Sequence, residues 1–350
     1  MLNLGIIGCG RGAETLHLPV LRTLPGMRIV GIVDDDKDRE TRVVDGLHIR
    51  QRYRHYSDLL TDPAIEAVAA WVPPNLQLEI VQAVLKAGKH LFVDKPLVFD
   101  LKAWDDLIQQ AASADRIVMV GFPRRWHRLI LRAREVIRQG RLKRLRLIRT
   151  VSTGIHPEKL GLQEADDGHL LKDALFHFGI HHFDLWHFLL ERDTEEVFAM
   201  RGADRSAVAV SARMSDGQVV SSTFQDGSTM NDEVEIYGDA GHFRVSCYRY
   251  DGFEYFPPAS HPGDMQLRLR HIAQSLSETP AGLLRMRHGG DFFRSYRTGW
   301  QHFLDSVRCH RRPDCTLEDG LRALRVVLAA SESAVSGRPV AVAYTGSRGE

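Results

Sequence analysis

Imidazole and carboxylate side chains recur at helical spacing between residues 173 and 184, a combination that can move protons. Asp173, His177, His181 and Asp184 are spaced i, i+4, i+8 and i+11, so they share one face of an α-helix. Apolar residues occupy the other faces of this segment. A face of acids and imidazoles is a costly way to build a core, and it suits a site where protons are transferred.

The residues alone leave three interpretations of this helix open. Its polar groups could be hydrogen-bonded to one another inside the protein, or an imidazole could act as a general base. His177 and His181 also have the i, i+4 spacing of metal ligands. No third ligand beyond the two acids is evident in the sequence, so we expect no metal.

A second chemical signal is the pattern G-x-G-x-x-A at residues 8–13, followed by Asp34. Gly8 permits a tight turn, Gly10 lets the backbone approach a pyrophosphate, and Ala13 lets helix and strand pack closely. An acid at position 34 can accept hydrogen bonds from a ribose. An ordinary structural loop is disfavoured, because the strand before the glycines, the helix after them and Asp34 all occur where a dinucleotide site requires them. The residues assigned to this dinucleotide site are Gly8, Cys9, Gly10, Arg11, Gly12, Ala13, Asp34 and Asp35.

The acids at positions 34–36 favour NAD over NADP as the cofactor. No Arg or Lys lies within this run to hold a 2′-phosphate, and three carboxylates would repel one. Lys37 and Arg39 follow closely, so NADP is less favoured rather than excluded.

These residues need a scaffold, and the first 122 residues alternate between strand and helix patterns. Apolar strand-like runs end at Val33, Val72, Val93 and Gly121, which predicts a doubly wound parallel sheet of the Rossmann type. Ligands bind beyond the carboxyl ends of such strands. The cofactor-binding residues predicted at these ends are Val72, Pro73, Pro74, Asn75, Gln77, Asp94, Lys95 and Pro96.

The rest of the chain predicts a different architecture. After Gly140, strand-like runs recur with turn signals between them, ending near Cys247. We therefore predict residues 1–122 as the Rossmann domain and 123–350 as an α+β domain with a large, mainly antiparallel open sheet. Residues 251–298 are the least readable: their aromatic and arginine side chains could line a pocket or lie in a subunit interface.

Composition excludes several classes of protein. The 350 residues are 43% hydrophobic and carry a net charge of +1, which argues against disorder and against a globally basic nucleic-acid binder. No apolar run has the length of a membrane span and no secretory signal is visible. The four cysteines show no CxxC spacing, so we expect reduced thiols in a cytoplasmic protein.

Five stretches together resemble one known family. They are GIIGCGRGAETLHLPVL (5–21), VGIVDDD (30–36), VPPNLQLE (72–79), AGKHLFVDKPL (87–97) and GFPRRW (121–126). The chain resembles the Gfo/Idh/MocA oxidoreductases, named after glucose-fructose oxidoreductase, inositol dehydrogenase and rhizopine catabolism. It departs from the family pattern at Asp94, where Glu is usual, and at Gln77, where His is common.

The resemblance implies roles for Lys95 and its neighbours. Lys95 alone could be a solvated loop charge, but in the family the matching lysine holds the substrate hydroxyl beside the nicotinamide. An ammonium there can stabilise a developing alkoxide. Pro96 restrains the backbone and could adopt a cis bond.

The resemblance also assigns the histidine helix and the substrate site. The family motif D-x-G-x-H-x-x-D aligns with residues 177–184, which makes His181 the group that exchanges the proton. His177 stands where the family has its first Asp, so either His177 or Asp173 completes the constellation. Arg125 matches a family position that opens toward the substrate, and Trp126 follows it.

Residues 124–149 hold eleven Arg or Lys and one acid, Glu135. These cations could be a solvated face balanced by acids elsewhere, or they could bind an anionic substrate such as a sugar phosphate, uronate or nucleotide sugar. Nucleic-acid binding is the least favoured of these three interpretations, because few aromatic side chains that could stack on bases lie among the cations.

Together these patterns predict an NAD-dependent oxidoreductase acting on a secondary hydroxyl or ketone of a sugar, a polyol or a related compound. The alternatives are a redox-silent regulator that binds a dinucleotide or sugar, and a dehydrogenase of a non-sugar substrate such as a dihydrodiol or an imine. The resemblance further implies a homodimer or homotetramer, with late helices and the last strand returning to the first domain.

Overall fold

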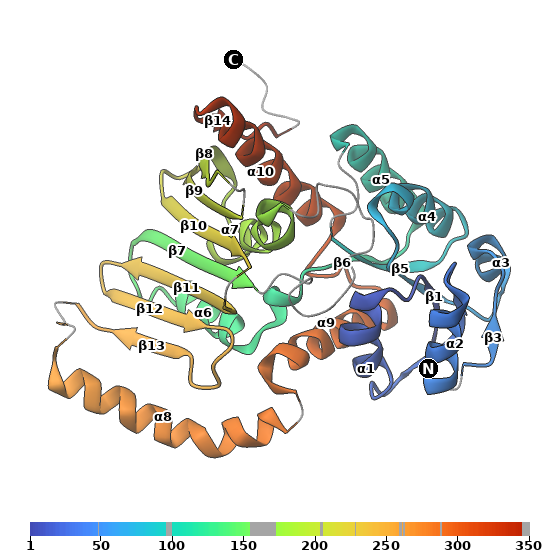
Figure 1. Ribbon diagram of the computed structural model, residues 1–350, viewed down its shortest axis with the longest axis horizontal. Helices are drawn as coiled ribbons and strands as arrows, with labels where there is room; N and C mark the ends of the chain where they lie inside the picture. Colours follow the sequence, from blue (N-terminus) through green and yellow to red (C-terminus); the bar gives the residue numbers. More distant parts are fainter. Residues whose placement is uncertain are drawn as a thin grey trace. The chain divides into compact units, whose positions relative to one another are not determined.

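The chain forms two compact units, each with its own sheet (Figure 1). The computed structural model describes residues 1–47, 49–95, 100–154, 173–203, 206–227, 229–258, 261, 263–287 and 289–344. The first unit comprises Met1–Pro123 and Ser295–Leu321, and the second comprises Arg124–Arg294 and Arg322–Glu350. Both units are therefore built from two separate stretches of sequence.

The first unit contains a six-stranded parallel sheet in the order β3-β2-β1-β4-β5-β6. The strands are β1 (Leu2–Ile7), β2 (Met27–Val33), β3 (Gln51–Arg52), β4 (Ala67–Ala70), β5 (His90–Asp94) and β6 (Val118–Gly121). This order places a topological switch point between β1 and β4. The predicted doubly wound Rossmann sheet is confirmed.

Helices connect these strands as the alternating pattern predicted. They are the π-helix η1 (Ala13–His17), α1 (Leu18–Leu21), α2 (Lys37–Leu47), α3 (Tyr56–Thr61), α4 (Pro74–Lys86) and α5 (Leu101–Ala114). The central strand β4 is fully buried, as expected for a parallel strand covered on both faces. The Asp100 side chain caps α5 by accepting a hydrogen bond from the Lys102 amide at 2.9 Å.

Late residues complete the core of the first unit. Trp300 in α9 (Gly290–Arg308) is fully buried and stacks on Phe92 of β5 with ring centroids 4.0 Å apart. Gly320 in α10 (Leu317–Ser336) lies so close to Trp104 that a Cβ there would approach the indole to 2.5 Å. Residues 295–321 are thus part of the packed core of this unit.

The second unit contains an eight-stranded sheet in the order β13-β12-β11-β7-β10-β9-β8-β14. Its strands are β7 (Leu145–Gly154), β8 (Thr194–Arg201), β9 (Ala207–Met214), β10 (Val219–Asp226), β11 (Asn231–Gly238), β12 (Gly241–Ser246), β13 (Phe253–Phe256) and β14 (Val340–Ala341). All neighbours pair antiparallel except β7 and β10. The predicted mainly antiparallel sheet is confirmed.

One expectation about the last strand is wrong. β14 pairs antiparallel with β8, Val340 opposite Val197, so it extends the second sheet instead of returning to the first domain. Pairing with an edge strand satisfies backbone groups that would otherwise be exposed.

Helices on the second unit position its polar residues. They are the 3₁₀ turn η2 (Pro123–Trp126), α6 (Arg128–Arg138), the π-helix η4 (Leu175–Gly179), α7 (Ile180–Leu190) and α8 (Met265–Met286). The sequence did not predict α8 or β13, which fall in its least readable part. None of the described helices is long and apolar enough to cross a membrane.

Candidate functional site

The glycine turn after β1 has the backbone shape that a dinucleotide requires. Gly8 has φ +78°, and a Cβ there would lie 2.3 Å from the Trp71 carbonyl oxygen, so only glycine fits. At Gly10 and Gly12 a Cβ would meet no described heavy atom within 4 Å. The first hydrogen bond of the following helix runs from the Glu14 amide to the Gly10 carbonyl. The amides before Glu14 therefore have no partner within the helix and can bind an anion.

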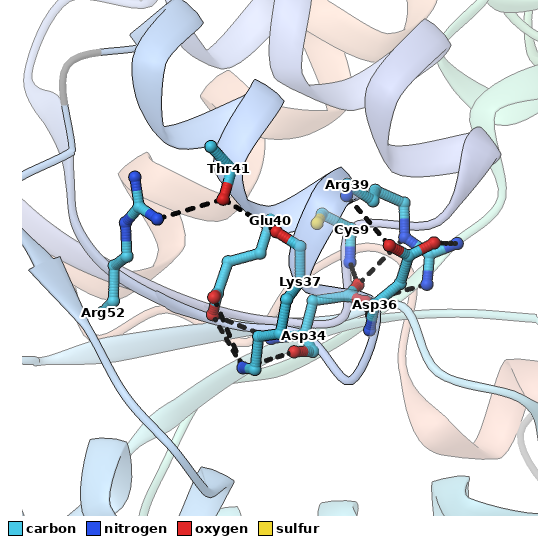
Figure 2. A network of polar contacts seen from close by, with 8 residues as sticks. All are labelled: Cys9, Asp34, Asp36, Lys37, Arg39, Glu40, Thr41 and Arg52. Atoms are coloured by element: carbon cyan, nitrogen blue, oxygen red, sulfur yellow. Dashed lines mark hydrogen bonds and ion pairs between the residues drawn. The ribbon is translucent and has the colours of Figure 1, made fainter.

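Asp34 lies at the centre of a polar network beside this turn (Figure 2). Its carboxylate accepts hydrogen bonds from the amides of Cys9 (2.6 Å) and Asp36 (2.8 Å) and from the Arg39 guanidinium (2.8 Å). Burial alone would raise the pKa of Asp34, but these donors hold that pKa below its ordinary value. Burial and the neighbouring Asp34 raise the pKa of the Cys9 thiol, so Cys9 is not a nucleophile.

Arg39 changes the charge balance that favoured NAD. Its guanidinium pairs with Asp34 and lies 3.9 Å from Asp36, and its side chain is 31% exposed. A cation therefore offsets the acids that were expected to repel a 2′-phosphate. The preference for NAD over NADP stays a prediction.

The loop after β4 and the first turn of α4 contain buried polar atoms that suit a polar ligand. Gln77 is 5% exposed and donates from Nε2 to the Val72 carbonyl at 3.1 Å. Among the described residues, Gln77 Oε1 and Trp71 Nε1 are buried without a hydrogen-bond partner. Such atoms are costly unless a ligand or water satisfies them. Together with the open glycine cradle, they fit a dinucleotide at the carboxyl ends of β1 and β4.

His17, which no motif in the sequence singles out, joins three parts of the first unit. Its Nδ1 accepts a hydrogen bond from Trp300 Nε1 at 3.0 Å, so its Nε2 carries the proton and donates to Asp94 at 3.0 Å. Asp94 fits there because Gly121 has no side chain; a Cβ would lie 2.0 Å from Asp94 Oδ1. The end of β5, which leads directly into Lys95, is thereby fixed to the helix after the glycine turn. The sequence showed the alternating strand and helix patterns around His17, but it did not show which residues His17 contacts.

Lys95 follows β5 directly and is half-buried. Pro96, and with it the suggested cis bond, lies outside the described residues. Val72 and Pro73 lie in the β4–α4 connection, and the backbone of Pro74 and Asn75 begin α4. The first unit therefore brings the described residues of the predicted cofactor site to the carboxyl edge of one sheet, and Lys95 comes from the same edge.

The histidine helix differs from the predicted single polar face. Asp173 pairs with Arg201 at 2.6 Å, His177 is exposed, His181 is half-buried and Asp184 is 2% exposed. The prediction assumed a regular α-helix, but residues 175–179 form a π-helix, which holds an extra residue in its turn. The residues before it are rotated relative to those in α7. Asp173 is engaged with Arg201, and the role of His177 beside His181 stays a prediction.

Arg125, whose contact with the substrate stays a prediction, is buried in an ion pair. It is 3% exposed and binds Asp184 through two parallel hydrogen bonds of 2.6 and 2.8 Å. Trp126 beside it is 8% exposed. This bidentate pair anchors α7, the helix that carries His181, to the start of the second unit.

The basic stretch at residues 124–149 is mostly neutralised by acids elsewhere in the second unit. Eight of its arginines form ion pairs: Arg124–Asp232, Arg125–Asp184, Arg128–Asp291, Arg132–Glu278, Arg134–Glu191, Arg138–Glu191, Arg146–Asp239 and Arg149–Glu235. The interpretation as a balanced face explains these contacts. An anion-binding role for the stretch is not needed to account for its charge.

His182 makes the second unit sensitive to acid. Its side chain is fully buried, and burial lowers its pKa to about 4. The unfolded chain binds a proton near the ordinary value of 6.5, so the folded state loses stability as the pH falls from 6.5 to 4. The loss amounts to roughly 2 kcal/mol at pH 5.

We predict that His182→Leu removes this part of the acid sensitivity. Urea unfolding at pH 8 and pH 5 measures it, and wild type should lose more stability between the two than the variant. His90, whose pKa is also lowered to about 4 by burial, remains in both proteins as an internal reference. Equal losses in both proteins would contradict the assignment.

No group of three His, Cys, Asp or Glu side chains that could hold a metal ion occurs within the described ranges. Several acids of the second unit pair with arginines; Asp232, for example, accepts a hydrogen bond from Arg124 at 2.6 Å and also lies 3.7 Å from His182.

Comparison with known proteins defines the class. An NAD-binding Rossmann-fold model of an oxidoreductase family matches residues 2–122, and the C-terminal α/β domain model of the same family matches residues 134–342. The chain is thus an NAD-binding oxidoreductase by fold and sequence. It belongs to the Gfo/Idh/MocA family.

Three similar proteins are distant in sequence but cover nearly all of this chain. Myo-inositol 2-dehydrogenase of Thermotoga maritima is 27% identical over 352 residues, spanning 97% of this chain and 98% of the relative. The structure of scyllo-inositol dehydrogenase from Lactobacillus casei with bound NAD(H) and scyllo-inositol has a TM-score of 0.77 at 19% identity, covering 98% of this chain and 100% of that chain. WlbA dehydrogenase from Bordetella pertussis, in complex with NADH and UDP-GlcNAcA, gives 0.78 at 18% identity over 98% of each chain. The two structures show the same fold.

Proposed function

We propose that this protein is an NAD-dependent dehydrogenase that interconverts a secondary hydroxyl and a ketone on a cyclic polyol or sugar. The observation that carries the proposal is the fixed carboxyl edge of the first sheet. There the open glycine cradle, the anionic Asp34 and the strand end before Lys95 occur together. Bound NAD supplies the hydride acceptor or donor.

Lys95 is proposed to orient and polarise the substrate oxygen. Its ammonium follows a strand end that His17 fixes through Asp94, so the charge can be held in place before reaction. A preorganised cation stabilises the negative charge that develops on the oxygen.

His181 is proposed to take the proton from the hydroxyl, and to return it in the reverse direction. It is half-buried at the start of α7, and the buried Arg125–Asp184 pair holds that helix. His177 replaces the usual acid one turn earlier and is exposed, so it can pass a proton to solvent. The family match and the aligned motif support this role.

A neutral cyclic polyol is the substrate class that we favour over an anionic sugar. Eight arginines of the basic stretch already have acidic partners, and Arg125 is buried. The relative from Thermotoga maritima is named for myo-inositol, which fits this choice.

Nicotinamide fluorescence on the purified protein tests the proposal. We expect NADH to bind more tightly than NADPH, and we expect turnover with at least one inositol or neutral sugar in a panel that also contains uronates and nucleotide sugars. Binding of NADH without turnover of any compound would favour the redox-silent regulator. Binding of neither dinucleotide would remove the enzyme assignment.

His181→Asn provides a test of the proton-transfer step. We expect kcat to fall by about 10² to 10⁴, because a positioned general base contributes that much, while the Kd for NADH stays unchanged. In the direction of alcohol oxidation, the same variant should also lose the acid-side limb of the kcat profile, where protonation inactivates a general base. His187→Asn, on the same helix and further from the aligned motif, is the matched control and should keep wild-type activity.

A further inference from the structure

The turn that leads into His181 has an irregular backbone. In the π-helix η4 the Ile180 amide donates to the Leu175 carbonyl, five residues earlier, where an α-helix would use the carbonyl four residues earlier. The turn therefore holds one extra residue. Such turns are rare, so the surroundings must stabilise this one. Expelling the extra residue would rotate the preceding chain by about 100° about the helix axis, which would change how His177 is offset from His181.

Two close packing contacts hold the middle and the end of the π-helix against the second sheet. The Phe178 ring occupies space that Gly154 of β7 leaves open, because a Cβ on Gly154 would lie 2.4 Å from that ring. A Cβ on Gly179 would approach Phe224 of β10 to 3.3 Å. Glycine at both positions therefore lets the π-helix lie directly on the sheet.

The start of the π-helix is held by a polar contact at Asp173. Its Oδ1 accepts a hydrogen bond from the Leu175 amide at 3.0 Å, and its carbonyl accepts from the amides of Phe176 and His177. This is the pattern of a residue that caps a helix. The second carboxylate oxygen, Oδ2, lies 2.6 Å from a guanidinium nitrogen of Arg201, the last residue of β8. The capping residue is therefore tied to the sheet.

Arg201 is itself fixed at two points of the second unit. Its backbone lies in β8 opposite Val208 of β9, and its Nη2 donates to the Ser331 hydroxyl of α10 at 3.2 Å. The side chains of Arg201 and Asp173 are each only 14% exposed, so this pair is shielded from the water that weakens surface ion pairs. A shielded pair between a strand and a capping residue can hold the first turn of a helix in place.

A second pair of the same kind holds the helix beyond His181. Asp184 of α7 binds the buried Arg125. His181 thus lies between two acids, Asp173 and Asp184, and each acid is bound to an arginine from another element. Two such contacts, one before the imidazole and one after it, fix the rotation of the helix about its axis as well as its position along that axis.

We propose that Arg201 is a positioning residue for proton transfer at His181, and that it acts by holding the π-helical turn through Asp173. The proposal rests on the proposed function of His181. It gives Asp173 a supporting part in place of a direct one in the reaction. Arg201 lies far from the histidines in the sequence and belongs to no motif, so only the fold reveals its connection to them.

Steady-state kinetics tests the proposal with matched variants. Arg201→Met should lower kcat by about tenfold to 10²-fold, because a misplacement of about 1 Å has effects of that size, while KM and the Kd for NADH stay at wild-type values. Asp173→Asn keeps a side chain that can cap but loses the ion pair, so it should lower kcat by the same factor. The control, Arg213→Met, removes an exposed ion pair from β9 and should keep wild-type kcat.

The double variant Arg201→Met/Asp173→Asn shows whether the two residues act through one contact. We expect it to be no slower than either single variant, because residues in direct contact are not additive. Losses that multiply in the double variant would mean that the residues act separately, and the proposal would be wrong. If Arg201→Met fails to fold, as judged by circular dichroism, Asp173→Asn is compared with Arg213→Met in its place.

Nuclear magnetic resonance of isotope-labelled histidine gives a readout that does not need turnover. The His181 ring signal is identified by its absence in His181→Asn. It should move in Arg201→Met and in Asp173→Asn, and it should stay in place in Arg213→Met. A fully active His181→Asn would refute the proposed function of His181. An unmoved His181 signal or a wild-type kcat in folded Arg201→Met would refute the positioning role of Arg201 alone.

Discussion

Replacing Lys95 by Met is expected to lower kcat by about 10² to 10³, the effect of removing one preorganised donor that stabilises a developing oxyanion. Methionine retains the length of the side chain and removes the ammonium. Because the glycine cradle and Asp34 are unaffected, the Kd for NADH should change less than twofold. Steady-state kinetics with the best substrate of the inositol panel, combined with NADH fluorescence, measures both quantities.

The control for this variant is Lys102→Met. Lys102 is exposed in the first turn of α5, where its backbone amide makes the capping contact. The activity of Lys102→Met should therefore equal that of wild type. His17→Gln provides an intermediate case: it weakens the support of Asp94, and we expect a smaller loss of kcat than in Lys95→Met. A Lys95→Met enzyme with wild-type kcat would show that another group polarises the substrate.

Replacing Arg125 by Ala is expected to destabilise the protein by about 3–5 kcal/mol, because it leaves the Asp184 carboxylate buried without its partner. Both side chains are almost inaccessible, at 3% and 1% exposure. Urea unfolding of wild type and variant at pH 7.5 gives the difference. Asp184→Asn should cost less than Arg125→Ala, because a neutral amide can still accept a hydrogen bond from the guanidinium.

Two further variants distinguish the loss of the buried Arg125–Asp184 pair from the general effect of removing an arginine. Arg138→Ala removes the exposed contact with Glu191, where both side chains are about half exposed, and it should cost less than about 1 kcal/mol. The double variant Arg125→Met/Asp184→Leu removes both charges and should recover much of the lost stability. A double variant as unstable as Arg125→Ala would mean that the charges themselves are not the cause.

The sequence predicted those elements whose signals are local. Gly8 has a positive φ that only glycine adopts without strain, and residues 4–7 before it form an apolar run. The first sheet was therefore recognisable from its apolar runs and from the turns between them. The alternating strands of the second unit, such as β9 with its regularly alternating burial, were visible for the same reason.

Features that depend on tertiary partners could not be predicted in this way. The acidic partners of Arg125 and Arg124 lie 59 and 108 residues away in the sequence. A run of arginines that the sequence presented as a possible anion site therefore forms internal ion pairs in the structure. The π-helix at residues 175–179 has no local signature that we could use, yet it separates Asp173 from the face of His181. Helix α8 was missed because its apolar side faces solvent and its polar side faces a strand.

Residues 295–321 complete the core of the first unit, and this has a consequence for how the protein is made. A ribosome synthesises Met1–Pro123 long before Trp300, the residue that stacks on Phe92 and hydrogen-bonds His17. At about 5–20 residues per second, the nascent first unit waits for Arg124–Arg294 of the second unit to be translated before its core can close. During that interval the second unit, most of which is contiguous in sequence, can fold first. The second unit is therefore expected to fold before the first, although the first unit begins the chain. A chaperone that shields the unfinished first sheet would act in that interval.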